Sequence, residues 1–409
     1  MKALIVAEYY PRSGDPVGGV WAHRQALATR DAGAEIRVLV LHRPLPPLAT
    51  VRRAQVRRAL SVIAQPRAER LDGLSVEYVR YLSPPRPLSY RSWGTWAAPA
   101  LARAIARVGR EFRFDLIHAH YAVPAGDAVI RAARAAPLVV SVHGHDVQGA
   151  GAGGPVVAAT LRHARLVLAN SAGTARRCSV LGARATRVVH LGADVPCPPA
   201  GGAEAGSEGA GAGSERAGAG SGGAAGDRTL VTVGHLAARK RHADVISALA
   251  LLRDRHPRLR YVVVGDGPER ERLETLTRSL GVADRVHFRG QLPNDQATGI
   301  ARSGSLFVMP SVDEAFGVAY VEAMAGGVPA IGCAGEDGPQ EIAAAGGGIV
   351  LVAPGDVPAL AARIDALLSD RSALDALADA ARDTVRREFT WELCGSRTLE
   401  AYEYALRSW

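Results

Sequence analysis

Residues 305–325 read SLFVMPSVDEAFGVAYVEAMA, and this stretch decides the fold class. It opens with a short apolar run, Ser305–Pro310, which predicts a buried β-strand. A turn follows, and the next residues predict a helix that begins near Gly317 and is apolar on nearly every side, as expected of a buried helix. An apolar strand followed directly by a buried helix is typical of a parallel sheet that is covered on both faces.

The same alternation of short apolar runs and helical stretches continues along all 409 residues. It predicts an α/β protein with two parallel-sheet domains that face each other across a cleft at the carboxyl ends of their strands. Helices are predicted between the strands, for example at 243–255 and 269–280. The predicted strands are 3–8, 35–41, 74–81, 116–120, 138–143, 166–170, 187–191, 229–234, 260–265, 286–289, 305–310, 330–332 and 348–352.

A low-complexity segment divides the chain. Residues 197–227 are almost entirely Gly, Ala, Ser, Glu and Pro, a composition that cannot bury enough apolar surface to offset its ordering entropy. We therefore expect a disordered linker between an N-terminal domain, 1–196, and a C-terminal domain, 228–388. Residues 389–409 have the apolar spacing of a helix, which could cross back onto the first domain.

Composition excludes several classes of protein. No apolar run is long enough to span a membrane, and the four cysteines show neither metal nor redox spacing, so we expect a cytoplasmic chain with reduced thiols. The net charge of +9 is carried by arginine, because Lys2 and Lys240 are the only lysines. The excess of arginine reflects either a general bias in amino-acid composition or a basic surface that binds phosphates, lipid headgroups or nucleic acid.

Two carboxylates flank the start of the helix near Gly317. Glu322 lies in the second turn of a helix that is otherwise apolar, where a carboxylate is costly unless a polar group meets it, and Glu314 lies just before the helix at the presumed cleft. Glu322 could accept two ribose hydroxyls and Glu314 could accept sugar hydroxyls, while the free N–H groups of Gly317, Val318 and Ala319 could bind a phosphate. The alternative is a helix-start glutamate and an internal ion pair.

The stretch from Glu314 to Pro329 resembles glycosyltransferase family 4, whose members are retaining enzymes of the GT-B fold. The family signature E-G/S-F-G-x4-E-A-M-A-x-G-x-P is matched except at Ala315, where glycine or serine is usual. The resemblance covers nearly the whole chain outside 197–227. It implies that Glu314 contacts the donor sugar and that Glu322 contacts the ribose.

The diphosphate of such a donor needs positive charge beside it. No Asp-x-Asp pair of the kind that often holds a metal–diphosphate complex occurs in the chain, so we expect cationic side chains to take this role without a metal or cofactor. The resembled family has a G-R-L-x-x-x-K-G loop after the first strand of the second domain. Here Lys240 matches the lysine, His235 stands in place of the arginine, and Arg239 could compensate; the alternative is a solvated basic turn.

Other candidate donor contacts rest on the same resemblance. It implies a nucleobase pocket near Gln291 and Leu292, and a glycine-rich loop, Gly18 and Gly19, beside the diphosphate and the acceptor. The helix after that loop carries His23, which we assign to the acceptor or sugar side.

Histidines collect at the ends of two predicted strands of the first domain. His118 and His120 close one strand, and His143 and Asp146 follow the next one. Carboxyl ends of adjacent strands should face the cleft, so we predict a sugar-side site here. The family resemblance places His143 against the transferred sugar; a zinc cluster is the alternative, although no metalloenzyme spacing supports it.

The sequence therefore predicts a metal-independent retaining glycosyltransferase that moves a sugar from a nucleotide-sugar donor to a hydroxyl of a glycan, a lipid-linked saccharide or a small metabolite. Residues 52–113 hold many arginines and few acids, which is consistent with peripheral attachment to the anionic inner face of the plasma membrane, as in polysaccharide-assembling relatives, or with a solvated basic face. The competing hypotheses are another GT-B enzyme, such as a nucleotide-sugar 2-epimerase, and a basic non-catalytic binding protein. No recognised nucleic-acid motif is present.

Overall fold

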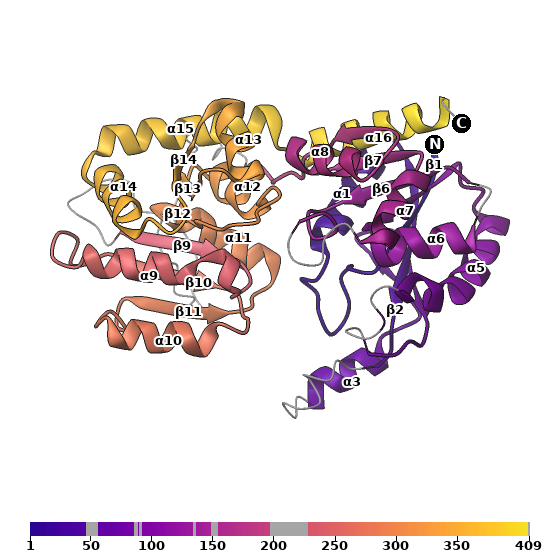
Figure 1. Cartoon of the computed structure of the whole chain (residues 1–409), viewed down its shortest axis with the longest axis horizontal. Helices are drawn as coiled ribbons and strands as arrows, with labels where there is room; N and C mark the ends of the chain where they lie inside the picture. Colours follow the sequence, from indigo (N-terminus) through magenta and orange to yellow (C-terminus); the bar gives the residue numbers. More distant parts are fainter. Residues whose placement is uncertain are drawn as a thin grey trace, which may run out of the picture.

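The computed structural model describes residues 1–45, 56–85, 89, 92–133, 136–148, 154–196 and 228–407, with only the backbone for 56–59. The predicted linker, 197–227, lies outside the described residues. Two α/β lobes lie side by side, the N-terminal one in indigo to magenta and the C-terminal one in salmon to orange (Figure 1). The predicted fold class is confirmed.

The N-terminal domain is built on an eight-stranded sheet in the order β3-β4-β2-β1-β5-β6-β7-β8. All its pairings are parallel except that of β3 with β4. The strands are β1 (Lys2–Ala7), β2 (Glu35–His42), β3 (Ala68–Leu71), β4 (Leu74–Arg80), β5 (Leu116–His120), β6 (Leu138–Val142), β7 (Leu166–Ala169) and β8 (Thr186–Val188). The helices are α1 (Val20–Asp31), α3 (Val56–Ala64), α5 (Trp93–Glu111), α6 (Asp127–Ala132), α7 (Pro155–His163) and α8 (Ala172–Val180), with a π-helical turn, η2, at Ala122–Gly126.

Both faces of this sheet are covered. Because side chains alternate along a strand, Ile5 of β1 joins an apolar cluster with Ala26 of α1, whereas Leu4 joins a second cluster with Leu101 of α5. Helices α6 and α7 also contribute to the second cluster. Apolar side chains on both faces explain why these strands read as uninterrupted apolar runs in the sequence.

The C-terminal domain has a six-stranded parallel sheet in the order β11-β10-β9-β12-β13-β14. Its strands are β9 (Thr229–Val233), β10 (Arg260–Val264), β11 (Val286–Gly290), β12 (Leu306–Val308), β13 (Ala330–Cys333) and β14 (Ile349–Val352). Its helices are α9 (His242–Leu251), α10 (Arg270–Ser279), α11 (Asn294–Ser303), α12 (Val318–Ala325), α13 (Asp337–Gly346), α14 (Val357–Ser369) and α15 (Arg371–Glu388), with a 3₁₀ turn, η3, at Ala238–Lys240.

The strand order of the second sheet places a reversal of direction between β9 and β12. From β9 the chain moves outward through β10 to β11, then returns to the other side of β9 and continues outward through β13 to β14. At such a reversal the loops that follow the two central strands diverge and leave a crevice, which is where ligands bind in open parallel sheets. The loops after β9 and β12 carry the two most distinctive sequence motifs.

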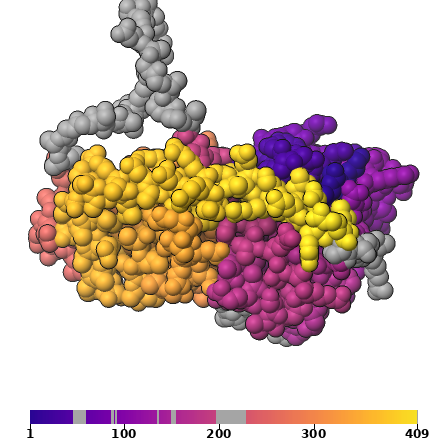
Figure 2. Space-filling model, turned by 90° about the horizontal axis from the view of Figure 1, so that it is seen from above, coloured from indigo at the N-terminus to yellow at the C-terminus, as the bar shows by residue number. Residues whose placement is uncertain are grey.

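The last helix, α16 (Trp391–Arg407), belongs to the N-terminal domain by its packing. It lies against α1 and shares the apolar cluster of β1, so the chain ends on the lobe where it began. In Figure 2 the C-terminal segment, in yellow, runs across both lobes. Among the described helices, none is long and apolar enough to cross a membrane.

Each predicted strand is present in the structure. Most strand ends differ from the prediction by no more than two residues. The helix predicted near Gly317 begins at Val318, with Gly317 at its N-cap. The antiparallel β3 was missed, because AERL has none of the β-branched or aromatic residues that indicate a strand.

Close packing of α16 on α1 predicts a destabilising effect of Gly395→Ala. A methyl group at Gly395 would lie 2.1 Å from the carbonyl oxygen of Ala28, so the two helices would have to separate. We expect the free energy of unfolding, measured by urea titration, to fall by about 1–3 kcal/mol.

The matched control is Gly299→Ala in α11, where no described atom lies within 4 Å of the added methyl group. Alanine is the better helix former, so this variant should be at least as stable as the parent, by up to about 1 kcal/mol. Equal effects of the two substitutions would contradict the packing argument.

Candidate active site

The crevice of the C-terminal sheet holds a buried ion pair. Lys240 ends the 3₁₀ turn that follows β9, and Glu314 lies in the loop that follows β12. Their side chains meet with Lys240 Nζ 2.5 Å from Glu314 Oε2, and both residues are less than a tenth exposed. Two segments 74 residues apart therefore converge on the reversal point of the sheet.

Further positive charge and a hydroxyl surround the Glu314 carboxylate. Ser311 Oγ donates to Oε2 at 2.9 Å, and Arg239 Nη1 lies 3.7 Å away. Burial alone would raise the pKa of Glu314, but the adjacent Lys240 and Arg239 charges outweigh it and hold the pKa below its usual value. The site therefore presents a carboxylate and a cationic cluster side by side at neutral pH.

The loop that carries Glu314 also shapes the start of α12. Gly317 caps the helix with φ of 87°, and a side chain here would collide with the Tyr320 ring at 2.4 Å. The backbone N–H of Glu314 donates to Glu336 Oε2 at 2.8 Å, which fixes the loop from the far side. The first N–H groups of α12, at Val318 and Ala319, border the crevice and have the positive polarity that binds anions.

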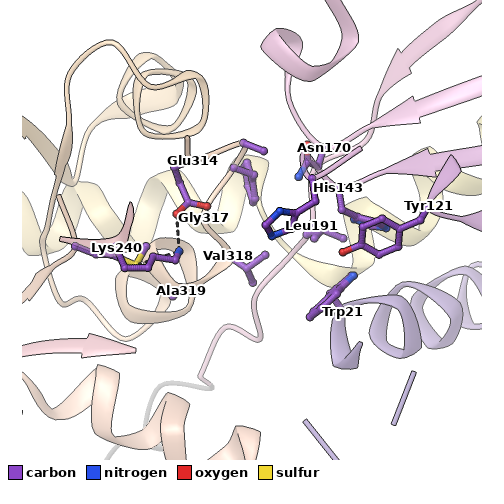
Figure 3. A pocket seen from close by; sticks show the side chains of 14 residues that line it. Trp21, Tyr121, His143, Asn170, Leu191, Lys240, Glu314, Gly317, Val318 and Ala319 are labelled. Carbon is purple, nitrogen blue, oxygen red and sulfur yellow. Dashed lines mark hydrogen bonds and ion pairs between the residues drawn. The ribbon is translucent and has the colours of Figure 1, made fainter. Parts of the chain in front are cut away.

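The N-terminal domain closes the crevice into a cavity of about 180 Å³. Figure 3 shows Trp21, Tyr121 and His143 from this domain on one side, and Lys240 and Glu314 on the other. The remaining lining residues are His145, Asn170, Leu191, Met309, Ala315, Phe316, Gly317, Val318 and Ala319.

A second cavity of about 90 Å³ adjoins the first around Arg239, Asp313 and Gln148. His143, His145 and Glu314 line both. The domains approach closely here, because a methyl group at Gly144, whose φ is 98°, would lie 2.4 Å from the Cβ of Ala315. Small residues at these two positions let the loop after β6, which carries His143 and His145 and is called the histidine loop below, approach the loop that carries Glu314.

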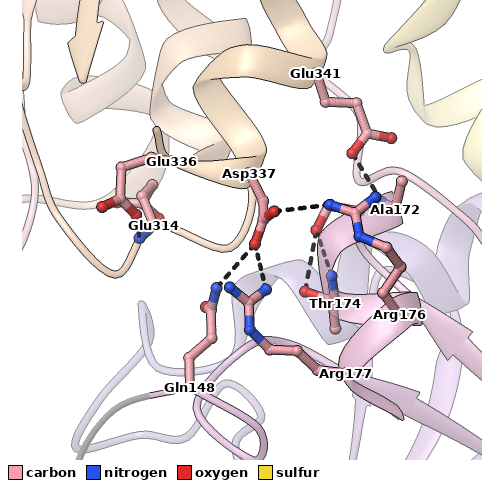
Figure 4. A network of polar contacts seen from close by, with 10 residues as sticks. Gln148, Ala172, Thr174, Arg176, Arg177, Glu314, Glu336, Asp337 and Glu341 are labelled. Atoms are coloured by element: carbon pink, nitrogen blue, oxygen red, sulfur yellow. Dashed lines mark hydrogen bonds and ion pairs between the residues drawn. The ribbon is translucent and has the colours of Figure 1, made fainter. Parts of the chain in front are cut away.

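Side chains from α13 bind the N-terminal domain beside the cavity (Figure 4). Asp337 accepts from Arg176 at 3.2 Å, from Gln148 at 3.4 Å and from Arg177. Glu341 accepts from the N–H of Ala172 at 2.8 Å and from His190 Nε2 at 2.6 Å. These contacts fix the separation of the two domains on which the cavity depends.

Four residues predicted on the sugar side line neither cavity: His23, His118, Asp146 and His120. His23 is buried in α1, with its ring nitrogens 2.8 Å from Tyr10 Oη and 2.8 Å from Asp72 Oδ2. His118 is fully buried, with its nitrogens 2.7 Å from Tyr402 Oη and 2.7 Å from Ser141 Oγ. Both ring nitrogens of His118 are used inside the core, whereas those of His23 meet the buried Tyr10 and the exposed Asp72.

Asp146 is the third. It accepts backbone N–H groups of Ala122, Val123 and His143, and burial raises its pKa to about 7. It holds the histidine loop in place rather than facing the cavity. The zinc alternative receives no support, since the described residues contain no group of three His, Cys, Asp or Glu that could hold a metal ion.

The other predicted contacts lie outside the linings of the two cavities. His120 is fully buried behind His143. Glu322 is half-buried near Arg302 and accepts from Asn294, and burial raises its pKa to about 7 although Arg302 opposes the shift. The remaining residues of this group are Gly18, Gly19, His235, Gln291 and Leu292.

Sequence reasoning missed several residues of the site, among them Trp21, Asn170 and Glu336. Trp21 and Asn170 line the larger cavity, and Glu336 holds the Glu314 loop. Trp21 lies two residues after Gly19, and Asn170 directly follows β7, so their positions beside predicted loops were the available signal.

Two facing parallel-sheet domains with a charged crevice between them define the class of GT-B proteins. Residues 17–195 match the family model described as Glycosyltransferase Family 4, and residues 219–384 match the one described as Glycosyl transferases group 1. Together the two matches extend over most of the chain, which belongs to glycosyltransferase family 4.

Relatives of known name share part of the chain. It is 33% identical over 174 residues to 2-deoxystreptamine glucosyltransferase of Streptomyces kanamyceticus, covering 42% of this chain and 45% of that protein. It is 34% identical over 186 residues to D-inositol 3-phosphate glycosyltransferase of Streptomyces bingchenggensis, covering 43% and 40%. The chain thus spans less than half the length of these curated relatives.

Solved structures are similar over their whole length. Sucrose-phosphate synthase from Thermosynechococcus elongatus superposes with a TM-score of 0.74 at 19% identity, covering all of both chains. HepE from Anabaena, solved in complex with UDP-glucose, superposes with a TM-score of 0.67 at 20% identity, covering 99% of this chain and all of the other. At these identities the likeness establishes the GT-B fold alone.

The buried ion pair predicts a pH-dependent effect of Lys240→Met. Without the lysine, Glu314 is a buried charge with one fewer partner, and the free energy of unfolding at pH 7 should fall by about 3–5 kcal/mol. In the parent, Glu314 has a lowered pKa, so its contribution is present above the unfolded-state pKa and is lost as pH falls through the folded-state pKa. In the variant, burial dominates and raises the pKa of Glu314. The difference in free energy of unfolding between parent and variant should therefore become smaller as the pH falls from 7 to 5.

Urea unfolding at both pH values checks this. The control is Arg272→Met in α10, which removes an ion pair whose arginine is 70% exposed and should change stability by less than about 0.5 kcal/mol. A Lys240→Met deficit as small as that of the control, or one that grows toward pH 5, would contradict the assignment.

Proposed function

We propose that this chain is a retaining glycosyltransferase that transfers a sugar from a nucleotide-sugar donor to a hydroxyl acceptor without a metal ion. The observation that carries the proposal is the Lys240–Glu314 pair at the reversal point of one sheet, opposite His143 of the other domain. A cation for a diphosphate, a carboxylate for sugar hydroxyls and a facing imidazole thus share one cavity.

The donor diphosphate would lie between Lys240, Arg239 and the N-terminus of α12. The lysine ammonium has three donors and uses one on Glu314, so it can also bind a phosphate oxygen. The N–H groups of Val318 and Ala319 supply neutral donors in the same region. These fixed positive groups would stabilise the charge of the departing diphosphate, which is the role that a metal plays in other transferases.

The sugar would lie between Glu314 and His143. A carboxylate accepts several hydrogen bonds, so Glu314 can hold sugar hydroxyls while it remains paired with Lys240. No base is required beside the acceptor if the departing diphosphate takes its proton. The protein would then contribute positioning, a fixed electrostatic field and exclusion of water.

The nucleoside would extend toward Glu322, with Gln291 and Leu292 near the base. Burial raises the pKa of Glu322 to about 7, so the charged form is poorly stabilised in the unliganded protein. Ribose hydroxyls that donate to this carboxylate would relieve that cost. The UDP-glucose complex of HepE supports a nucleotide-sugar donor of this kind.

The acceptor side is the N-terminal domain. Two similar relatives are named for acceptors with hydroxyls on a six-membered ring, 2-deoxystreptamine and inositol phosphate, which supports a polyol, glycan or lipid-linked saccharide here. Helix α3 projects from this lobe (Figure 1), and Leu60 and Ile63 on it are 58% and 51% exposed. This apolar end beside an arginine-rich segment supports peripheral attachment to an anionic membrane. Residues 51–55, which include the first two arginines of this segment, lie outside the described residues.

The activity test uses the purified chain, a panel of nucleotide sugars and polyol acceptors, with EDTA present throughout. We expect release of a nucleoside diphosphate and a product whose anomeric configuration, measured by NMR coupling constants, equals that of the donor. Strict dependence on Mg²⁺ or Mn²⁺, inversion of the configuration, or conversion of the donor without an acceptor would each refute this function.

Ribose recognition predicts that Glu322→Ala loses donor binding. In a thermal-shift screen against UDP-, GDP-, dTDP- and ADP-glucose, the parent should be stabilised by its best donor, by about 2.7 kcal/mol at about 100 times the Kd. Glu322→Ala should show no shift with that donor because its ribose contact is gone.

The control for the screen is Glu271→Ala, which removes an exposed carboxylate from α10 and should keep the full shift. An unchanged shift in Glu322→Ala would refute the ribose assignment.

A further inference from the structure

Aromatic side chains form one wall of the larger cavity. Trp21 of α1 and Tyr121, which directly follows β5, line the cavity on the side of the N-terminal domain, opposite Lys240 and Glu314 (Figure 3). The ring of Tyr9 packs beside that of Tyr121, with 5.1 Å between the ring centroids, and Tyr9 is 38% exposed. Trp21, Tyr121 and Tyr9, called the aromatic wall below, therefore continue from the cavity to the protein surface.

Two backbone features bring the aromatic wall together. A methyl group at Gly19, whose φ is 76°, would lie 2.1 Å from the carbonyl carbon of Tyr9, so glycine lets the start of α1, and with it Trp21, approach Tyr9. Tyr121 itself has a φ of 75°, where a bulky side chain is rarely found. Strained residues of this kind are concentrated at ligand-binding sites, and here the strained residue is one that lines the cavity.

The two sides of the cavity differ in charge. Burial lowers the pKa of His143 to about 3 and the pKa of His145 below its usual value, so both rings are neutral at pH 7. The other described residues that the N-terminal domain contributes to the lining are also uncharged: Trp21, Tyr121, Asn170 and Leu191. Lys240, Glu314 and the start of α12 lie on the opposite side, which suits a diphosphate. The N-terminal side suits an uncharged ligand.

Two residues of this uncharged lining have a polar atom without a partner in the described part of the chain. Nε1 of Trp21 is a buried donor, and Oδ1 of Asn170, a residue only 7% exposed, is a buried acceptor. Unpaired buried groups of this kind are costly, and side chains that served packing alone, such as phenylalanine and leucine, would not carry that cost. A hydroxyl both donates and accepts, so a hydroxylated ligand has the chemistry that this side of the cavity lacks.

We propose that the aromatic wall is the acceptor subsite, and that it takes an uncharged saturated ring, a pyranoside or a cyclitol, whose C–H face lies against Trp21 and Tyr121. The inference rests on the proposed function for the donor on the opposite side of the cavity. Binding of the ring itself requires no transfer reaction, so it can be measured separately. Tyr9 lies at the surface end of the wall, where the remainder of a larger acceptor would extend into solvent.

The shape of the acceptor follows from the physics of an aromatic surface. An aromatic face offers apolar area, and a ring whose hydroxyls are equatorial presents a flat face of axial C–H groups that can cover it. The hydroxyls then lie at the edge of the ring, where they remain available for hydrogen bonds. An open-chain polyol with the same number of hydroxyls must lose the freedom of several rotatable bonds to present such a face, so it should bind more weakly.

The first test measures binding without transfer. Saturation-transfer NMR titrations of the full chain, with and without UDP, use scyllo-inositol, methyl β-glucopyranoside and mannitol as probes. We expect at least one of the two rings to bind, with a Kd about tenfold below that of mannitol. The ring that binds more tightly identifies the acceptor as a cyclitol or a sugar. Equal binding of mannitol and the rings, or no binding of either ring in both conditions, would overturn the proposal.

The second test removes the aromatic faces one at a time. In Trp21→Ala, both the Kd of the ring probe and the KM for the acceptor should rise about tenfold, with kcat nearly unchanged, because a stacking contact is lost. Tyr9→Ala alters an exposed side chain with little risk to folding and should raise KM for an extended acceptor about threefold. The thermal shift with the best donor should persist in both variants. An unchanged KM, or a lost donor shift in Trp21→Ala, would overturn the assignment.

The matched control is Trp96→Ala, which removes a 47% exposed tryptophan of the same domain that lines neither cavity. It should keep Kd and KM within about twofold of the parent. A control that raised KM as much as Trp21→Ala would assign the effect to general loosening of the domain. The two levels of inference fail separately: absence of a donor thermal shift in the parent refutes the proposed function, whereas a donor shift without ring binding refutes the acceptor subsite.

Discussion

The buried contact between Lys240 and Glu314 is the constraint on which the site depends. Taking two charges out of water is costly, and the pair is stable only because each ion has the other within 2.5 Å and because Ser311 adds a hydrogen bond. Its position follows from topology, since β9 and β12 are neighbours at the point where the sheet changes direction. The loop geometry, including Gly317 at the start of α12, is built around this contact.

The site also requires that the two domains lie at a fixed distance from each other. Asp337 and Glu341 on α13 bind α8 and His190, and Gly144 lies directly against Ala315. Helix α16, which follows the last helix of the second domain, also packs on α1 of the first domain. These contacts are spread over several segments. They place His143 and Glu314 in the lining of the same cavity, although the two residues follow strands of different sheets.

Sequence reasoning reached most of the fold and part of the site. The alternation of apolar runs indicated both sheets, and the stretch from Glu314 to Gly317, with Lys240, indicated the residues that line the crevice of the second domain. Four residues predicted on the sugar side line neither cavity, namely His23, His118, His120 and Asp146. A polar residue beside the cleft in sequence can point either into the cleft or back into the core, and the sequence does not distinguish the two. Both nitrogens of His118 are used by Tyr402 and Ser141, and Tyr402 is remote in sequence.

The sequence by itself determined the class of fold, the family and the loops that carry charge, since these depend on local periodicity and on motifs of short span. Only the tertiary structure decided which polar side chains face the cavity and which satisfy one another inside the domain. It brought Lys240 to Glu314 across 74 residues, and His120 to His143 across 23. Hydrogen-bond partners between distant segments are set by strand order and domain packing, and no local pattern of residues records them.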